Sequence, residues 1–185
     1  MRIFRSIVPV FALILAGAAS AQTPSPKLPD VPYVPTPERV VAEMLKVANV
    51  KKSDVLYDLG SGDGRIVITA AKRLGTRGTG IELLPALVQE ARENARKAGV
   101  SRLAKFVEGD IFDANISDAT VVTLYLLPEV NMRLRPKLLE LRPGTRIVSH
   151  NYDLGDWKPK KTITLKLPDG EHTVFYWVVP SRQKS

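Results

Sequence analysis

A glycine-rich stretch that follows an apolar run constrains this chain more than any other feature. Residues 55–65 read Val-Leu-Tyr-Asp-Leu-Gly-Ser-Gly-Asp-Gly-Arg, and the next apolar run ends in an acid, Glu82. An apolar strand, a glycine turn, a helical segment and a second strand that ends in an acid form the first half of a Rossmann-type βαβ unit. The pattern predicts a nucleoside-binding site at two neighbouring strand ends. The alternative is a glycine turn that only joins a strand to a helix.

The residues of this turn discriminate among nucleoside cofactors. With Gly60 and Gly62 in the first two places of a dinucleotide fingerprint, the third small residue falls at position 65, where the chain has Arg65. Asp63 would repel a pyrophosphate about 4 Å away by about 4 kcal/mol at an effective dielectric of about 20. S-adenosylmethionine has no phosphate, carries a cationic ammonium group, and has ribose hydroxyls that suit the carboxylate of Glu82. The turn therefore favours S-adenosylmethionine, and a P-loop is excluded because no Gly-Lys-Ser/Thr follows the glycines.

The composition bounds the class of protein. The chain has 185 residues, of which 44% are hydrophobic and 25% charged, as is typical of one globular domain with a substantial core. It contains no cysteine, which excludes thiol nucleophiles, disulfides and thiolate metal sites, and its two histidines predict no metal centre. The net charge is +8, but no basic stripe interleaved with aromatic residues is present, so we expect no nucleic-acid partner.

Residues 1–21 form a separate segment with the pattern of a secretory signal peptide. Two arginines precede an apolar run, and Ala19-Ser20-Ala21 supplies a small-residue cleavage site. We expect cleavage after Ala21 and export of the domain to the periplasm or another extracytoplasmic space. An uncleaved segment would instead hold the domain at a membrane. Either outcome sends the domain to a space where the supply of S-adenosylmethionine needs an explanation.

A proline-rich stretch links this segment to the folded domain. Prolines recur through residues 22–36, so we expect an extended linker whose second half lies close to the cofactor. Thr36 is the predicted cap of the first helix and Pro37 its first helical residue. The catalytic domain is therefore predicted to comprise residues 37–185.

From residue 37 onward, helix and strand patterns alternate. Helical periodicity predicts helices at 37–48, 65–74, 85–98 and 129–141, the last with a kink or break at Pro136. Runs of β-forming residues predict strands at 55–58, 78–83, 104–108, 120–124 and 145–149, followed by a hairpin of residues 162–167 and 172–179. This order predicts an α/β fold, a Rossmann-like three-layer sandwich with a seven-stranded, mostly parallel sheet that ends in an antiparallel hairpin.

Several stretches make the chain similar to one known family. The element order resembles the class I, or seven-strand, S-adenosylmethionine-dependent methyltransferases over nearly the whole chain after residue 21. Within this class, residues 33–36 (Tyr-Val-Pro-Thr), 58–68, 124–130 (Leu-Tyr-Leu-Leu-Pro-Glu-Val) and 146–150 (Arg-Ile-Val-Ser-His) resemble the seven-strand protein lysine methyltransferases. The likeness is to the mitochondrial enzymes that methylate lysine in the ATP synthase c subunit and the adenine nucleotide translocase, and to their bacterial relatives.

Position in such a fold predicts which residues contact the methionine part of the cofactor. The backbone of Gly60 and Gly62 should approach it, and Asp58 and Asp63 should lie near its ammonium group, directly or through water.

Other residues are predicted to contact the nucleoside part. Glu82 should accept hydrogen bonds from the ribose hydroxyls, and Leu83 should pack on the adenine. Asp110 resembles the family acid that accepts a hydrogen bond from the adenine amino group, with Ile111 supplying backbone and apolar contact. The alternative for Asp110 is a turn that only ends the third strand.

Further candidates come from the ends of other elements. The resemblance implies that Tyr33 and Thr36 close over the cofactor. Tyr125, after the fourth strand, is the candidate catalytic residue that lines a lysine channel, or else a packing residue. His150 is either a polar channel residue or a structural histidine, and Trp157 is a lid or packing residue.

The resemblance implies a protein lysine N-methyltransferase that transfers a methyl group in line to a protein substrate. In-line transfer from a sulfonium needs positioning more than a base or metal. The Asn/Asp-Pro-Pro-Tyr/Phe motif of enzymes that methylate nucleobases or glutamine is missing after the fourth strand. Alternatives are a small-molecule or lipid methyltransferase and a non-catalytic protein that binds S-adenosylmethionine.

Overall fold

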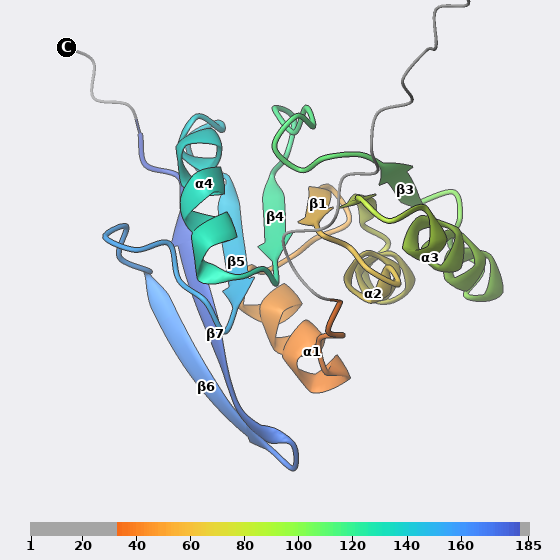
Figure 1. Cartoon of the computed structure of the whole chain (residues 1–185), viewed down its shortest axis with the longest axis horizontal. Helices are drawn as coiled ribbons and strands as arrows, with labels where there is room; N and C mark the ends of the chain where they lie inside the picture. Colours follow the sequence, from red (N-terminus) through yellow and green to blue (C-terminus); the bar gives the residue numbers. More distant parts are fainter. Residues whose placement is uncertain (1–32, 182–185) are drawn as a thin grey trace, which may run out of the picture.

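The computed structural model describes residues 33–181. The predicted signal peptide and residues 22–32 of the predicted linker lie outside this range. The described part contains a seven-stranded sheet with the order β3-β2-β1-β4-β5-β7-β6 (Figure 1). Its strands are β1 (Val55–Leu59), β2 (Arg77–Glu82), β3 (Ala104–Glu108), β4 (Val121–Leu124), β5 (Arg146–His150), β6 (Lys161–Leu167) and β7 (Gly170–Val178).

The strand order places a ligand site at one position along the sheet. β1 to β5 pair in parallel, and β7 lies antiparallel between β5 and β6. From β1 the chain adds β2 and β3 on one side and then crosses to place β4 on the other side of β1. In open α/β sheets, ligands bind outside the carboxyl ends of the strands where the order reverses. Here that position is between β1 and β4.

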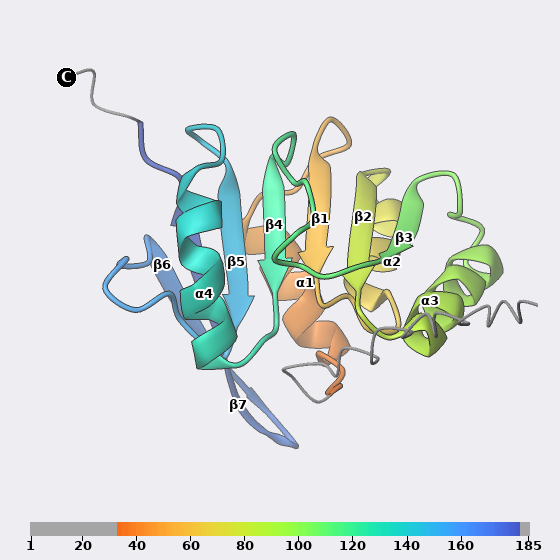
Figure 2. The same ribbon diagram turned by 45° about the horizontal axis from the view of Figure 1, so that its top comes forward.

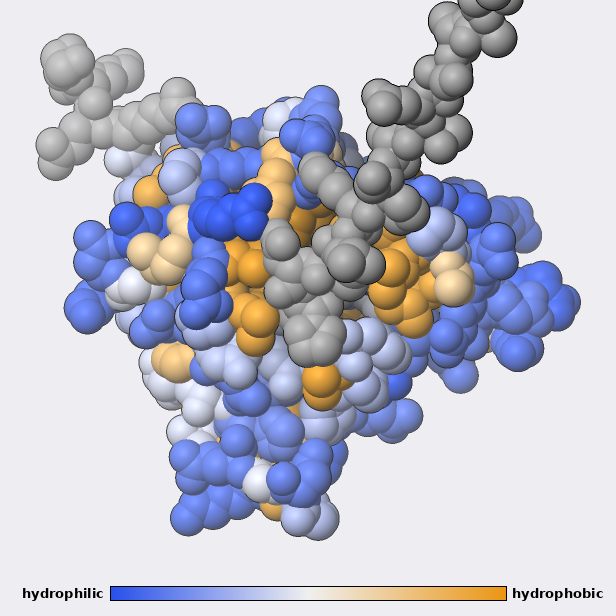
Figure 3. Space-filling model, in the orientation of Figure 1, coloured by the Kyte–Doolittle hydropathy of each residue, from blue (hydrophilic) through white to orange (hydrophobic). Residues whose placement is uncertain are grey.

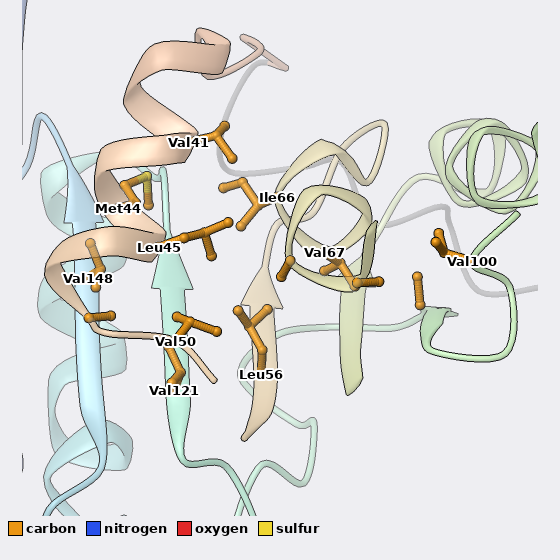
Figure 4. Close-up of a cluster of buried hydrophobic side chains, with 14 of the residues drawn as sticks. Val41, Met44, Leu45, Val50, Leu56, Ile66, Val67, Val100, Val121 and Val148 are labelled. Atoms are coloured by element: carbon orange, nitrogen blue, oxygen red, sulfur yellow. The ribbon is translucent and has the colours of Figure 1, made fainter. Parts of the chain in front are cut away.

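Helices cover both faces of the sheet, as predicted for a three-layer sandwich. One face carries α1 (Glu38–Val47), α2 (Arg65–Leu74) and α3 (Pro85–Lys97), and the other carries α4 (Pro128–Leu139) (Figure 2). Met44 of α1 and Val67 of α2 pack with Leu56 of β1 in the first apolar core (Figure 4). The second core joins α4 to the opposite face and contains the fully buried Trp177.

A hydrogen-bonded network joins several elements at the amino ends of the strands. Asp54, just before β1, accepts hydrogen bonds from the Lys51 N–H at 2.7 Å and the Thr120 hydroxyl at 2.8 Å. Arg146 of β5 pairs with the same carboxylate and donates to the carbonyl oxygen of Ala48 at 2.8 Å. Burial alone would raise the pKa of Asp54, but these hydrogen bonds lower it. The network therefore ties α1, β1 and β5 together at the edge opposite the expected site.

Every predicted helix and strand is present, with ends that differ from the prediction by at most two residues. One local prediction was wrong, and one alternative of another was excluded. Thr36 does not cap α1, because Pro37 is the extended residue before the helix and the Thr36 hydroxyl instead lies 3.4 Å from Nδ1 of His150. The predicted break at Pro136 is absent, because α4 continues through it, whereas a kink there stays a prediction. The carbonyl that loses its helical partner there belongs to Met132, a residue that is 40% exposed.

The face seen in Figure 3 is mostly hydrophilic, with hydrophobic residues gathered near its middle. Among residues 33–181, none of the helices has the length and apolar character needed to cross a bilayer.

Gly64, between the glycine turn and α2, allows the helix to pack closely on the sheet. Its φ is +82°, and a Cβ at this position would lie 2.4 Å from the Phe106 ring and 3.0 Å from Cβ of Ala91. The third glycine of the turn therefore provides the close packing that the dinucleotide fingerprint assigns to position 65.

This packing leads to a prediction for stability. Gly64→Ala should lower the free energy of unfolding by about 3 kcal/mol, because it combines left-handed backbone strain with overpacking. Gly99→Ala is the matched control: its φ is +72°, but no atom lies within 4 Å of the added Cβ. We expect a loss of about 1 kcal/mol for the control in urea denaturation. Equal losses in the two variants would contradict the close-packing role.

Candidate active site

One pocket opens outside the carboxyl ends of β1, β2 and β4. All the residues predicted as site residues line it, namely Tyr33, Thr36, Asp58, Gly60, Gly62, Asp63, Glu82, Leu83, Asp110, Ile111 and Tyr125. The fold therefore brings together residues from five separate segments of the chain. Their individual roles toward a cofactor stay predictions.

The Glu82 carboxylate connects the two strand ends that carry the site. One oxygen accepts a hydrogen bond from the Gly62 N–H at 2.9 Å, and the other accepts one from the Leu84 N–H at 3.0 Å. Glu82 is 7% exposed. A carboxylate offers about four acceptor positions, so two remain for the predicted hydrogen bonds with the ribose hydroxyls.

Residues 33–36, which we call the strap, are held over the glycine turn. Arg65 donates from Nη1 to the carbonyl oxygen of Thr36 at 3.0 Å and from Nη2 to Asp63 at 2.7 Å. The Tyr33 ring covers Gly62, where an added Cβ would lie 2.4 Å from Cε2 of the ring. Burial and the nearby Asp63 charge raise the pKa of Tyr33. Arg65 thus joins the strap to the turn.

Asp58 is the most deeply buried acid of the pocket. Its carboxylate accepts a hydrogen bond from the Thr123 hydroxyl at 2.7 Å. Burial raises the pKa of Asp58 to about 7, and the charges of Glu82 and Asp63 add to this rise, although the hydrogen bond from Thr123 opposes it. A cationic group beside Asp58 would favour its ionised form.

The loop after β3 closes one side of the pocket. Asp110 accepts a hydrogen bond from the Phe112 N–H at 2.9 Å, so its carboxylate forms the strand-ending turn that was the alternative role, while the residue also lines the pocket. Lys137 of α4 donates to the carbonyl oxygens of Ile111 at 3.0 Å and Phe112 at 2.7 Å. The guanidinium of Arg133 lies 3.9 Å from the centre of the Phe112 ring. Helix α4 therefore fixes the loop that bears Asp110 and Ile111.

Tyr125 lies between the pocket and a buried histidine. Its ring centroid is 3.9 Å from that of His150, which has no exposed surface and is not part of the pocket lining. Burial lowers the pKa of His150 to about 4, and the neighbouring His172 adds to this effect. His150 is thus a structural histidine that supports Tyr125. Trp157 is a packing residue, because its ring lies 6.2 Å from that of Trp177 and its carbonyl oxygen accepts a hydrogen bond from the Trp177 indole at 2.6 Å.

Several residues of the pocket lining were not predicted as site residues, among them Arg65, Phe112, Leu126 and Arg133. Arg65 was considered only as an oversized residue of the fingerprint, although its position two residues after Asp63 is a signal for an ion pair. The spacing of Arg133 and Lys137 on one face of α4 is a comparable signal. Phe112 and Leu126 lie in short loops, where periodicity carries no information.

The pocket chemistry fits S-adenosylmethionine, since buried acids suit its positive charges and the apolar Leu83 and Ile111 suit adenine. A family model described as the ANTKMT methyltransferase domain matches residues 58–161. The chain belongs to this family.

Individual relatives of this methyltransferase are similar over most of its length. It is 48% identical over 154 residues to a protein-lysine N-methyltransferase of Saccharolobus islandicus, an alignment that covers 82% of this chain and 96% of the relative. It is 34% identical to the lysine N-methyltransferase of Mus musculus that is named for the c subunit of ATP synthase, covering 80% of this chain but 60% of that protein. The chain therefore spans less than two thirds of the mouse enzyme.

A solved structure identifies the cofactor class. The crystal structure described as an RNA methyltransferase from Salinibacter ruber is 56% identical, with a TM-score of 0.77, and the match covers 82% of this chain and 97% of that one. That protein holds S-adenosyl-L-homocysteine, the compound left when S-adenosylmethionine loses its methyl group. The family and this structure confirm the predicted fold, the methyltransferase activity and S-adenosylmethionine as the cofactor.

The raised pKa of Asp58 predicts pH-dependent cofactor binding. If the ammonium group binds beside Asp58, it favours the carboxylate, so binding releases a proton wherever free Asp58 is protonated. The affinity should therefore rise about tenfold from about pH 5.5 to about pH 7.5 and level off above the pKa of about 7. Isothermal titration calorimetry measures this directly. Asp58→Asn should bind more weakly with a flat pH dependence, and a wild-type profile without a rise would contradict the role of Asp58.

Proposed function

We propose that this methyltransferase methylates lysine side chains of a protein substrate. One observation carries the proposal: the 48% identity to a protein-lysine N-methyltransferase extends over 96% of that relative, so the two share their whole domain. The lysine N-methyltransferases named for the c subunit of ATP synthase and for adenine nucleotide translocase support the same substrate class.

The strand order supports a position for the methyl acceptor. Asp110 follows β3, Glu82 ends β2 and Gly60 follows β1, so the predicted adenine, ribose and methionine contacts lie in that order along the sheet. The reactive methyl group then belongs between β1 and β4, where Tyr125 follows β4. Between β4 and β5 the chain has only α4 and short loops, with no inserted domain over this end. An extended protein segment fits such an arrangement.

Positioning is the main contribution of the protein to this reaction. Bound S-adenosylmethionine supplies an electrophilic methyl group on a sulfonium. The glycine turn, Glu82 and Asp58 hold it at the β1 end, while Tyr125 lines the approach of the acceptor nitrogen. Free lysine has a pKa of about 10.4, so the amine loses a proton before it attacks. Removal from water beside a positive charge lowers the pKa of a lysine and promotes this loss.

The purified protein should transfer label from radioactive S-adenosylmethionine to lysine-containing protein. Chemical dimethylation of the substrate lysines should abolish the transfer, and excess S-adenosylhomocysteine should do the same to the untreated substrate. Mass spectrometry of the product should place the added methyl groups on lysine nitrogens. Transfer that survives blocking of the lysines would contradict the proposed substrate class.

RNA is the second candidate substrate, because the Salinibacter ruber relative is described as an RNA methyltransferase. The same assay with RNA in place of protein separates the two candidates. We expect no label in RNA. Label in RNA alone would replace the lysine proposal, and label in neither, despite bound cofactor, would favour the small-molecule or lipid acceptor or the non-catalytic binding protein.

We also propose export of the domain by residues 1–21, on the basis of the signal-peptide pattern of that segment. Cell fractionation should find the protein outside the cytoplasm with an amino terminus at Gln22. A full-length protein in the membrane fraction would support the uncleaved alternative. A cytoplasmic protein that retains Met1 would contradict export.

A further inference from the structure

A chain of polar side chains runs from the strap to the β6–β7 turn and has no part in the methyl transfer described above. Thr36 Oγ1 lies 3.4 Å from His150 Nδ1, and His150 Nε2 lies 2.9 Å from His172 Nδ1. His172 Nε2 lies 3.3 Å from a carboxylate oxygen of Asp169. His150 has no exposed surface, whereas the Asp169 side chain is 60% exposed. These four polar side chains thus connect the pocket lining to the surface.

The carboxylate at the outer end sets the direction of these hydrogen bonds. A carboxylate only accepts, so it favours a proton on Nε2 of His172. This nitrogen makes no hydrogen bond of standard geometry within the described part, so the contact with Asp169 is an electrostatic one. Nδ1 of His172 is then an acceptor and takes the Nε2 proton of His150. Nδ1 of His150 is left as an acceptor for the Thr36 hydroxyl.

The neutral state of His150 agrees with this direction. Burial lowers the pKa of His150 to about 4, so the ring has one donor and one acceptor nitrogen near neutral pH. Because the Thr36 hydroxyl donates to His150, its oxygen lone pairs are the groups left for a pocket ligand. Thr36 and Tyr125 both line the pocket and both contact His150, which places them at the same end of it.

We propose that Thr36 Oγ1 orients the acceptor amine by accepting one of its N–H groups, and that His150, His172 and Asp169 are positioning residues that keep this hydroxyl in its accepting state. The proposal rests on the proposed lysine methylation. With one N–H on Thr36, the nitrogen lone pair can point at the methyl carbon. The N–C bond forms as the C–S bond breaks, and the electron pair of that bond stays on sulfur. If these hydrogen bonds ran in the opposite direction, the Thr36 hydroxyl would point its hydrogen at the amine and compete for the nitrogen lone pair.

Paired substitutions at Thr36 and His150 test the proposal. Thr36→Val keeps the shape but removes the hydroxyl, so the kcat of lysine methylation at saturating cofactor should fall about tenfold, while Thr36→Ser should stay within about threefold of the wild type. An asparagine oxygen can take the place of Nδ1 of His150, whereas a glutamine amide reaches the place of Nε2. His150→Asn should therefore retain a higher kcat than His150→Gln.

The outcomes separate this inference from packing effects. If His150 only fills space, the larger glutamine should serve at least as well as asparagine, and that result would overturn the proposal. An unchanged kcat in Thr36→Val would overturn it as well. Ser149→Ala is the control, because Ser149 is equally buried next to His150 but bonds to Asn131 instead of joining the chain. Its kcat should match the wild type, and thermal unfolding should show that each variant is folded.

NMR of the imidazole nitrogens gives a readout that does not depend on activity. We expect the ring of His150 to carry its proton on Nε2, and Nδ1 of His172 to accept that hydrogen bond. A proton on Nδ1 of His150 would mean that the hydrogen bonds run in the opposite direction, and this result would overturn the inference. If the wild type transfers no methyl group to lysine, the proposed function fails. If it is active but shows the wrong tautomer or no Asn-over-Gln preference, the inference fails alone.

Discussion

Three of the acids that line the pocket, Asp58, Asp63 and Glu82, lie at the ends of β1 and β2, and the surrounding groups limit the cost of keeping them together. Arg65 neutralises Asp63, and two backbone N–H groups satisfy the carboxylate of Glu82. Asp58 accepts a hydrogen bond from the hydroxyl of Thr123, and burial raises its pKa to about 7. Because Arg65 offsets Asp63, repulsion from Asp63 excludes a phosphate less strongly than its isolated charge implies. We therefore expect the buried Asp58 and its neighbour Glu82 to carry most of the preference for a positively charged cofactor.

The fold of the described part could be predicted almost completely from the sequence, because its signals are local. Glycines and prolines mark the helix ends, and the hydrophobic period separates helices from strands. Thr36 is the instructive exception: a threonine before a proline has the pattern of a helix cap, but a histidine 114 residues away takes its hydroxyl. The local pattern of a helix cap is present, but the Thr36 hydroxyl instead contacts His150, which is distant in sequence.

The site residues were predictable to the extent that they lie at strand ends. Asp58, Glu82 and Asp110 each follow from the position of a strand and the rule that ligands bind at its carboxyl end. The partners of these residues could not be predicted in this way. Thr123 and Arg133 reach the site from a central strand and a helix face, and only the three-dimensional arrangement shows which side chains they meet. The hydrogen-bond direction along the two histidines likewise depends on Asp169, a surface residue of a hairpin turn.

The network of Asp54, Thr120 and Arg146 lies at the edge of the sheet opposite the pocket. It joins the first helix and the central strands without contributing any group to the pocket lining. Contacts that hold the strands in register are thus physically separate from those that select a substrate. Loops at the pocket edge can then change through mutation while the opposite edge preserves the framework. This separation of the framework contacts from the pocket allows relatives with one fold to diverge toward different methyl acceptors.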